Sequence, residues 1–259
     1  MNNTVLKEVD ERGVCRITLN KPERHNAFDL QLIEELTEIT TVANQDNKVR
    51  VVVLTGAGPS FCSGADLNWM QSLVDYDYEE NVEDARKLAK LMRAFYQLDK
   101  PFLCAVNGSA YGGALGIIAC ADIAIAVDHA KFSFSEVKLG IIPAVIMPYV
   151  TACVGRSHAK RLFLTAERFT AVAAQNIGLL DHLASDETFS ETCNREIELL
   201  LAASPDAQQA CKKLLRKVSP IDQEIDKQTT KAIAEIRVSE QGQQGLQAFL
   251  LKTKPPWLT

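Results

Sequence analysis

Residues 56–66 of this chain read GAGPSFCSGAD, and residues 107–113 read NGSAYGG. Each stretch follows an apolar run typical of a buried strand and leads into a predicted helix. The first N–H groups of a helix lack intrahelical acceptors, and the helix dipole favours negative charge there. Neither stretch contains a lysine or the G-x-x-x-x-G-K-[ST] pattern, which disfavours phosphate binding. The two turns therefore predict two sources of backbone N–H groups that could together hold an oxyanion.

Working outward from these turns, short apolar strands alternate with helices. Strands are predicted at 14–19, 50–55, 102–106, 122–127 and 131–134, and helices at 29–41, 67–73, 85–96 and 113–120. The charged segment 75–84 between two of these helices is predicted to be a mobile loop. Repeated strand, turn and helix units indicate an α/β layered core.

The second half of the chain is predicted to be helical from Ser157 onward. Ser157 and Thr170 are candidate N-caps, and Gly178 is a candidate C-cap. Two further Ser-Pro pairs place a capping hydroxyl before a first-turn proline, at 204–205 and 219–220. Three long helices are therefore predicted near 187–203, 205–217 and 220–239, with apolar positions suited to covering a neighbour.

Composition excludes several classes of protein. The chain has 259 residues, 47% apolar content and a net charge of -5, which fits one α/β domain, or one domain with an appendage, and gives no footprint for nucleic acid. The N-terminus is polar, and no apolar run reaches membrane length. Seven cysteines without C-x-x-C spacing indicate reduced core thiols of a cytoplasmic protein, and four histidines without an H-E-x-x-H pattern disfavour a metal site.

The best candidate for a catalytic carboxylate is Glu136, which follows a strand and precedes an apolar turn. Desolvation there would raise its pKa into the range that suits proton transfer near neutrality. The alternative is a salt bridge to Lys138 or Arg161. Asp66 is interpreted as a helix cap, and Asp122 as a structural hydrogen-bond acceptor. A serine hydrolase is disfavoured because no G-x-S-x-G with histidine and acid partners is present.

Several of these motifs together resemble the crotonase, or enoyl-CoA hydratase/isomerase, superfamily over nearly the whole chain. They are SGADL at 63–67, NG through GG at 107–113, CAD at 120–122 and the segment 132–143. More narrowly, GADLNWM at 64–70 with SEVKLG at 135–140 and IPAVI at 142–146 resembles bacterial methylglutaconyl-CoA hydratases of leucine breakdown. The resemblance implies a spiral of repeated ββα units at 1–195, carrying the acyl-CoA site. It also implies a C-terminal helical region at 196–259 that forms a homotrimer or a dimer of trimers.

The resemblance also implies how the reaction is catalysed. The backbone N–H groups of Ala65 and Gly113 correspond to the family's thioester oxyanion hole. Family hydratases commonly use two glutamates, and the second corresponds to Glu136. The first falls on Gly116, which has no side chain. Three interpretations follow: Glu136 shuttles both protons, a carboxylate of the substrate helps, or the reaction is migration of a double bond.

Substrate contacts implied by the resemblance are spread over the chain. Arg24 is expected beside the nucleotide of coenzyme A, and Ser63 with Ala65 along the adenine and pantetheine path. Phe249 and Lys252 correspond to positions that reach a neighbouring subunit's coenzyme A. The remaining expected contacts are Asp66, Leu67, Trp69, Tyr111, Gly112, Gly116, Pro143 and Ala144. The alternative for Arg24 and Lys252 is ordinary solvated charge, and for Trp69 and Tyr111 it is apolar core.

The sequence and its resemblance favour an enoyl-CoA hydratase that adds water to an α,β-unsaturated acyl-CoA. The expected substrate is 3-methylglutaconyl-CoA or a related branched ester. No cofactor is expected beyond the coenzyme A that the substrate carries. An isomerase that uses Glu136 alone is the first alternative, and a dehalogenase, a decarboxylase or a catalytically silent acyl-CoA-binding relative follows. A nicotinamide dehydrogenase is disfavoured because the chain lacks a G-x-G-x-x-G turn with a following acidic residue.

Overall fold

A computed structural model describes residues 4–258 and contains a six-stranded sheet in the order β1-β2-β3-β5-β7-β10. β1 (Val5–Val9) pairs antiparallel with β2 (Val14–Leu19), and the other neighbours are parallel. Four strands complete the sheet: β3 (Val51–Gly56), β5 (Phe102–Val106), β7 (Ile123–Val127) and β10 (His182–Ala184). Every residue of β5 is buried, as a parallel strand covered on both faces requires.

A second, smaller sheet is formed by short strands, most of which follow a strand of the larger sheet in the sequence. It has the order β4 (Ser60–Cys62), β6 (Ser109–Tyr111), β8 (Lys131–Ser133) and β9 (Phe169–Thr170), with β4, β6 and β8 parallel. β4 follows β3, β6 follows β5, and β8 follows β7. A helix follows β4 and β6 in turn, which confirms the predicted ββα repeat and the crotonase-like α/β fold.

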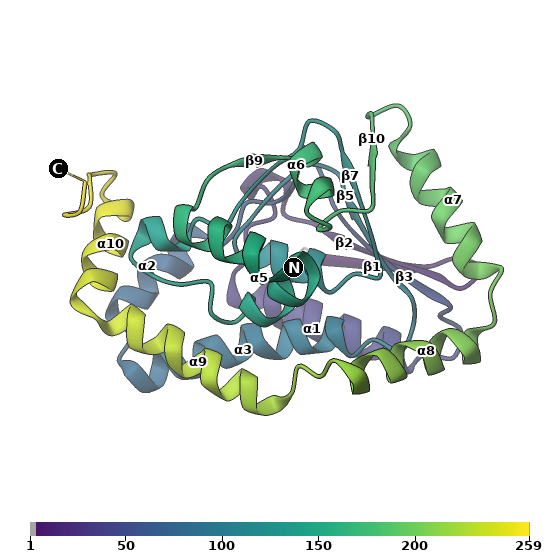
Figure 1. Cartoon of the computed structure of the whole chain (residues 1–259), viewed down its shortest axis with the longest axis horizontal. Coiled ribbons are helices and arrows are strands. Elements are labelled where there is room, and N and C mark those ends of the chain that lie inside the picture. Colours follow the sequence, from purple (N-terminus) through teal and green to yellow (C-terminus); the bar gives the residue numbers. More distant parts are fainter. Residues whose placement is uncertain (1–3, 259) are drawn as a thin grey trace.

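Helices cover the strands in the first part of the chain (Figure 1). α1 (Leu30–Gln45), α2 (Leu67–Asp75), α3 (Tyr78–Tyr96) and α4 (Gly113–Ala119) lie close to the predicted positions, with the short turns η1 (Pro22–Arg24) and η2 (Glu136–Leu139) between elements. The predicted mobile loop at 75–84 is wrong, because α3 already begins at Tyr78. Asp77 and Glu80 form a reciprocal capping box there, which satisfies two N–H groups at the start of the helix.

The second half of the chain differs from the sequence prediction in several places. α5 (Met147–Thr165) begins ten residues before the predicted N-cap Ser157, and Gly155, with a φ of 75°, interrupts it. Two strands, β9 and β10, lie where only helix was expected. Thr170 does cap α6 (Ala171–Asn176) by accepting from the N–H of Ala173, and Gly178 follows that helix with a φ of 81°.

Four C-terminal helices follow, where three were predicted: α7 (Phe189–Leu201), α8 (Pro205–Val218), α9 (Gln223–Val238) and α10 (Glu240–Leu250). Ser204 caps α8 as expected, but Asp222 rather than Ser219 caps α9. The predicted division at residue 195 falls inside α7. α9 packs on α3, and α10 packs on α2 and η2, so these two helices cover this chain's own core.

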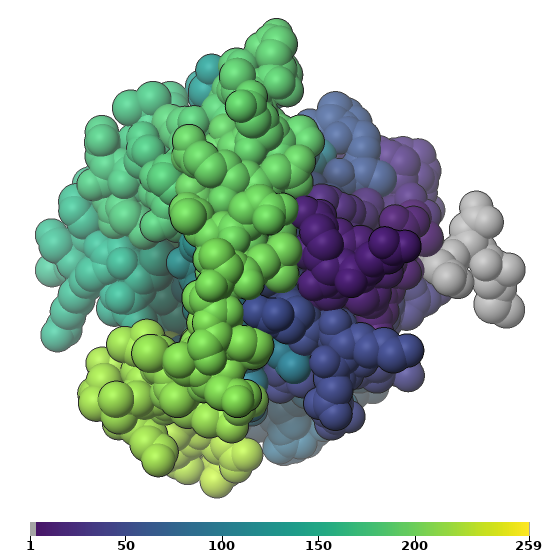
Figure 2. All heavy atoms as spheres, turned by 90° about the vertical axis from the view of Figure 1, so that its right-hand side faces the viewer, coloured from purple at the N-terminus to yellow at the C-terminus, as the bar shows by residue number. Residues whose placement is uncertain are grey.

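α7 and α8 form a ridge on one side of the molecule. Figure 2 shows it between the N-terminal strands in purple and the middle of the chain in teal. α8 has no buried residue, and several large apolar side chains of the ridge are exposed: Leu199, Leu214, Leu215 and Val218. An oligomer through the C-terminal helices stays a prediction.

Candidate functional site

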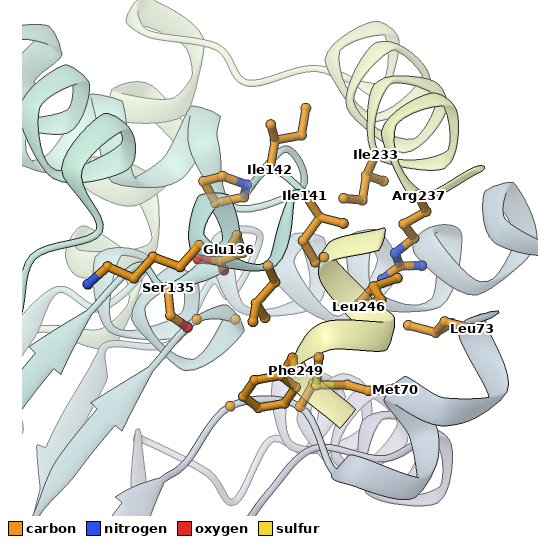
Figure 3. A pocket seen from close by; sticks show the side chains of 18 of the residues that line it. Met70, Leu73, Ser135, Glu136, Ile141, Ile142, Ile233, Arg237, Leu246 and Phe249 are labelled. Carbon is orange, nitrogen blue, oxygen red and sulfur yellow. The ribbon is translucent and has the colours of Figure 1, made fainter. Parts of the chain in front are cut away.

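A cavity of about 400 Å³ lies where the ends of the smaller sheet meet α2, α3, α9 and α10. Most of its wall is apolar, and Figure 3 shows the side chains that project into it. Its polar groups are few: backbone amides of the two glycine turns, Ser63, Ser135, Glu136, Lys138, Arg237 and Thr253. A mostly apolar pocket with a few placed polar groups is typical of a small-molecule site.

The two glycine turns meet because β4 pairs with β6. Phe28 donates its N–H to the carbonyl of Gly64 at 2.7 Å and accepts from the N–H of Asp66 at 2.8 Å. This pairing passes over Ala65, whose N–H has no acceptor among residues 4–258. Gly113 is the first residue of α4, so its N–H also lacks an intrahelical acceptor. Both residues line the cavity, and their amides are available to an oxygen bound there.

Glu136 begins η2, next to the second turn. A Cβ placed on Gly112 would lie 3.2 Å from Glu136 Oε1, so the carboxyl group lies directly beside the Gly112-Gly113 backbone. Oε2 is buried and has no hydrogen-bond partner within residues 4–258. Burial raises the pKa of Glu136 to about 7, against a small opposing effect of its own N–H. A carboxyl group with such a pKa can both accept and donate a proton near neutral pH.

The predicted alternative, a salt bridge from Glu136 to Lys138 or Arg161, is wrong. Lys138 Nζ donates instead to the carbonyl of Ala166 at 2.7 Å, and Arg161 pairs with Glu167. The carboxyl group of Glu136 therefore has no counter-ion among the described residues. Its position is not that of a structural ion-pair partner.

Gly116, expected among the substrate contacts, does not line the cavity. It lies on the buried face of α4, where a Cβ would be 2.4 Å from Ile146 Cγ2 and 2.8 Å from Met92 Sδ. Ile146, which does line the cavity, stands between Gly116 and the open space. A second carboxylate at this position has no room, because these two side chains already fill the place.

Asp66 and Arg24 form one unit beside the first turn. Asp66 caps α2 by accepting from the N–H of Asn68 at 2.9 Å, and Arg24 Nη1 lies 3.0 Å from its other oxygen. Burial alone would raise the pKa of Asp66, but these hydrogen bonds outweigh it and lower the pKa. The predicted cap is thus confirmed. Arg24 is half exposed, so part of its charge remains open to solvent.

The expected substrate contacts fall into two groups. Those that line the cavity are Ser63, Ala65, Trp69, Gly112, Gly113, Glu136, Pro143, Ala144 and Phe249. Those that lie outside it are Arg24, Asp66, Leu67, Tyr111, Gly116 and Lys252. The Tyr111 ring packs under the Arg168 guanidinium, 5.9 Å from its centroid, and Leu67 is 56% exposed. Phe249 reaches the cavity of its own chain, because α10 packs on η2 and α2.

Several residues of the cavity wall were missed from the sequence, among them Phe28, Ile142, Ile233, Arg237 and Leu246. Arg237 is 7% exposed and pairs with the equally buried Asp84, whose other oxygen accepts from Trp69 Nε1 at 2.8 Å. The available signal was one arginine next to Ile236 and four residues after Ile233, on a helix face that is otherwise apolar. A buried arginine is rare unless it is paired.

Other predicted features have structural roles or no counterpart. Asp122 accepts from the N–H of Phe102 at 2.7 Å and pairs with Lys212, as a structural acceptor does. All seven cysteines are free thiols. Within residues 4–258, no cluster of three or more histidine, cysteine, aspartate or glutamate side chains is arranged to hold a metal ion. No helix in that range combines the length and apolar character needed to cross a membrane.

Comparisons with known proteins agree with this geometry. A crystal structure of a putative enoyl-CoA hydratase/isomerase (crotonase) from Legionella pneumophila is 42% identical with a TM-score of 0.80, covering 99% of this chain and all of that one. An enoyl-CoA hydratase from Shewanella pealeana is 40% identical with a TM-score of 0.81, covering 98% and 96%. The 1,2-epoxyphenylacetyl-CoA isomerase of Escherichia coli is 36% identical over 79% of this chain and 78% of its own length. Residues 10–259 match the enoyl-CoA hydratase/isomerase family model, and the chain belongs to that family.

Proposed function

We propose that this protein is a hydratase that adds water across the double bond of an α,β-unsaturated acyl-CoA. The observation that supports this most directly is the Glu136 carboxyl group, buried without a counter-ion beside the amides of the second glycine turn. 3-Methylglutaconyl-CoA or a related branched ester is the proposed substrate, on the strength of the motifs at 64–70 and 135–146. The same proposal requires no metal or redox cofactor, since coenzyme A arrives with the substrate.

The proposed mechanism begins at the thioester carbonyl. Its oxygen accepts hydrogen bonds from the N–H groups of Ala65 and Gly113, and both bonds strengthen as the oxygen becomes an enolate oxyanion. One such donor typically contributes about 3 to 4 kcal/mol of transition-state stabilisation. Because the donors are backbone groups fixed by β4, β6 and α4, they need no reorganisation when the negative charge develops.

Glu136 then carries out both proton transfers, from water and to C2. In its ionised form it takes a proton from water as the water oxygen bonds to C3 and the π electrons move onto the thioester oxygen. The enolate collapses as the protonated Glu136 delivers that proton to C2, which restores the carboxylate. A pKa of about 7 suits this double role, because both forms are populated near neutrality.

A second candidate function is supported by the environment of Gly116. Ile146 and Met92 fill the space in which a second carboxylate would have to stand, so Glu136 is the one carboxylate lining the cavity among residues 4–258. One carboxyl group is enough to move a proton between C2 and C4 and thereby shift a double bond. Isomerisation is therefore the alternative, and a catalytically silent acyl-CoA-binding relative comes after it.

Assembly and location belong to the same proposal. The exposed Leu214, Leu215 and Val218 of α8 support a contact between subunits, as a homotrimer or a dimer of trimers would need. Free thiols throughout the chain support a cytoplasmic location. The mass of the protein in solution, measured by light scattering, tests the assembly.

Activity is tested with crotonyl-CoA, 3-methylglutaconyl-CoA and a 3-enoyl-CoA. Hydration removes the absorbance of the conjugated thioester, whereas isomerisation of the 3-enoyl ester creates it. Glu136→Gln keeps the shape of the side chain and is expected to lower turnover by about 10²- to 10⁴-fold while ester binding persists. Glu38→Gln, at an exposed position of α1, is the control. Full activity in the Glu136 variant would exclude the mechanism.

A further inference from the structure

Arg237 is a charged group of the cavity wall that the proposed hydration chemistry does not use. Its side chain is 9% exposed and extends from α9 towards Leu246 and Leu73, on the side of the pocket away from Glu136 (Figure 3). Its neighbours on the wall are apolar, among them Met70 and Ile233. Burying a guanidinium is costly unless its N–H groups find acceptors.

Only one edge of this guanidinium has its acceptors. Nη1 donates to Asp84 Oδ2 at 2.7 Å and weakly to Asn81 Oδ1 at 3.5 Å. Nε is buried and has no partner, and no acceptor within residues 4–258 binds Nη2. Both oxygens of Asp84 are engaged, Oδ2 by Arg237 Nη1 and Oδ1 by Trp69 Nε1. The Nε–Nη2 edge of Arg237 is therefore left without a protein acceptor.

The acidic side chain of the cavity wall lies away from this edge of Arg237. Arg237 and Lys138 are the cationic side chains that line the cavity, and Glu136 is the acidic one. Lys138 donates to a backbone carbonyl, so it has no carboxylate partner. Asp84 lies behind Arg237 and offsets one positive charge. The charge left over on the wall is therefore that of Lys138, so an anion at Arg237 depends on the open Nη2 group rather than on net charge.

We propose that Arg237 selects acyl-CoA esters whose acyl group ends in a carboxylate. Nε is enclosed by protein, so Nη2 is the nitrogen that a ligand in the cavity can reach, and a carboxylate oxygen can accept from it in a charge-assisted hydrogen bond. The thioester lies at the glycine turns beside Glu136, and the far end of the acyl group meets Arg237 across the pocket. An apolar end would leave Nη2 without an acceptor in a desolvated pocket. This inference rests on the proposed acyl-CoA function and names the residue that would recognise the carboxylate end of the acyl group.

The test measures binding rather than turnover, so that it does not depend on the reaction. Glutaryl-CoA and 5-methylhexanoyl-CoA are saturated and of similar shape, and they differ in carrying a terminal carboxylate or an isopropyl group. Titration calorimetry on the full chain gives the two dissociation constants and their ratio. We expect the wild type to bind glutaryl-CoA about 10- to 100-fold more tightly, as expected for a charge-assisted hydrogen-bonded pair.

Two variants and a matched control identify Arg237 as the cause. Arg237→Met combined with Asp84→Asn removes both charges together and keeps an acceptor for Trp69, so that no buried charge is left alone. This double variant is expected to lose the preference for glutaryl-CoA or reverse it, and Arg237→Lys to keep part of it. Arg93→Met is the control, because Arg93 also joins α3 to α9 through an ion pair, with Asp226, but does not line the cavity.

The outcomes separate this inference from the proposed function. A wild type that binds both esters equally, or a double variant with an unchanged ratio, overturns the role of Arg237. Loss of the preference in the Arg93 variant as well would show that packing of α9, not the guanidinium, sets the ratio. A protein that prefers glutaryl-CoA but neither hydrates nor isomerises any enoyl ester would keep the inference and refute the hydratase and isomerase proposals.

Discussion

Replacing Glu136 by glutamine should make the protein more stable at alkaline pH while it removes catalysis. The folded protein raises the pKa of Glu136 from 4.5 to about 7, because burial removes its carboxyl group from water and Oε2 has no hydrogen-bond partner among residues 4–258. Between these two values the folded state holds a proton that the unfolded state has released. The stabilisation from Glu136 is therefore complete below pH 4.5 and is lost as the pH rises to about 7.

The magnitude follows from the same two values. A tenfold change in proton affinity corresponds to about 1.4 kcal/mol, so ionised Glu136 lowers the free energy of unfolding by about 3 kcal/mol relative to its protonated form. A glutamine has no charge to desolvate and avoids this loss. The advantage of Glu136→Gln over the wild type should accordingly grow by about 2 to 3 kcal/mol between about pH 5 and about pH 8.5.

Urea denaturation of both proteins at the two pH values measures this difference directly. Glu38→Gln, at an exposed site on α1, is the control and should follow the wild type at both values. If the stability difference between Glu136→Gln and the wild type were the same at both pH values, Glu136 would not be titrating in the desolvated environment inferred here. A loss of stability on alkalinisation that is shared by all three proteins would also refute the reasoning.

Two other predictions concern glycines. Gly116→Ala places a Cβ 2.4 Å from Ile146 Cγ2 and should lower the free energy of unfolding by about 1 to 3 kcal/mol in chemical denaturation, with part regained when Ile146→Ala is added. For the same reason Gly116→Glu should not accelerate hydration, and a large gain in rate would contradict the packing described. Gly245→Ala places a Cβ 2.2 Å from the Leu139 carbonyl oxygen, so α10 must shift from η2. Steady-state kinetics should show a higher KM with little change in kcat, and an unchanged KM would argue against α10 as part of the binding wall.

Much of the fold could be predicted from local patterns. The apolar runs of β2, β3, β5 and β7 marked the buried strands, and the glycine turns marked the strand-to-helix transitions. The prediction of helices and strands failed where a local signal was misinterpreted or where the element was too short to give one. The charged residues at 75–84 were interpreted as a loop, although Asp77 and Glu80 are the capping box that begins α3. β9 and β10 are two and three residues long, too short for any periodicity to be visible.

The site could be predicted where it is made of backbone and not where it depends on long-range packing. Glu136 and the two glycine turns each lie at or just after a short strand of the smaller sheet, so the local sequence already indicated their chemistry. The position of Gly116 behind Ile146 depends on how the segment after η2 folds back over α4, which no local pattern reports. Arg237 reaches the cavity only because α9 packs on α3, a contact between segments far apart along the chain.

The parallel ladder of the smaller sheet has a consequence for folding. Ser60 pairs with Ser109, and Ala110 with Phe132. Forming each of these strand pairs closes a long loop, and the chain loses conformational entropy before new contacts compensate for the loss. The N–H groups of Ala65 and Gly113 follow β4 and β6 in the sequence, so they come together only after these strands have paired. An acyl-CoA ligand is therefore expected to bind the folded protein and not an early folding intermediate. By binding the folded state it stabilises that state. In a folding experiment, ligand should slow unfolding and leave the rate of refolding nearly unchanged.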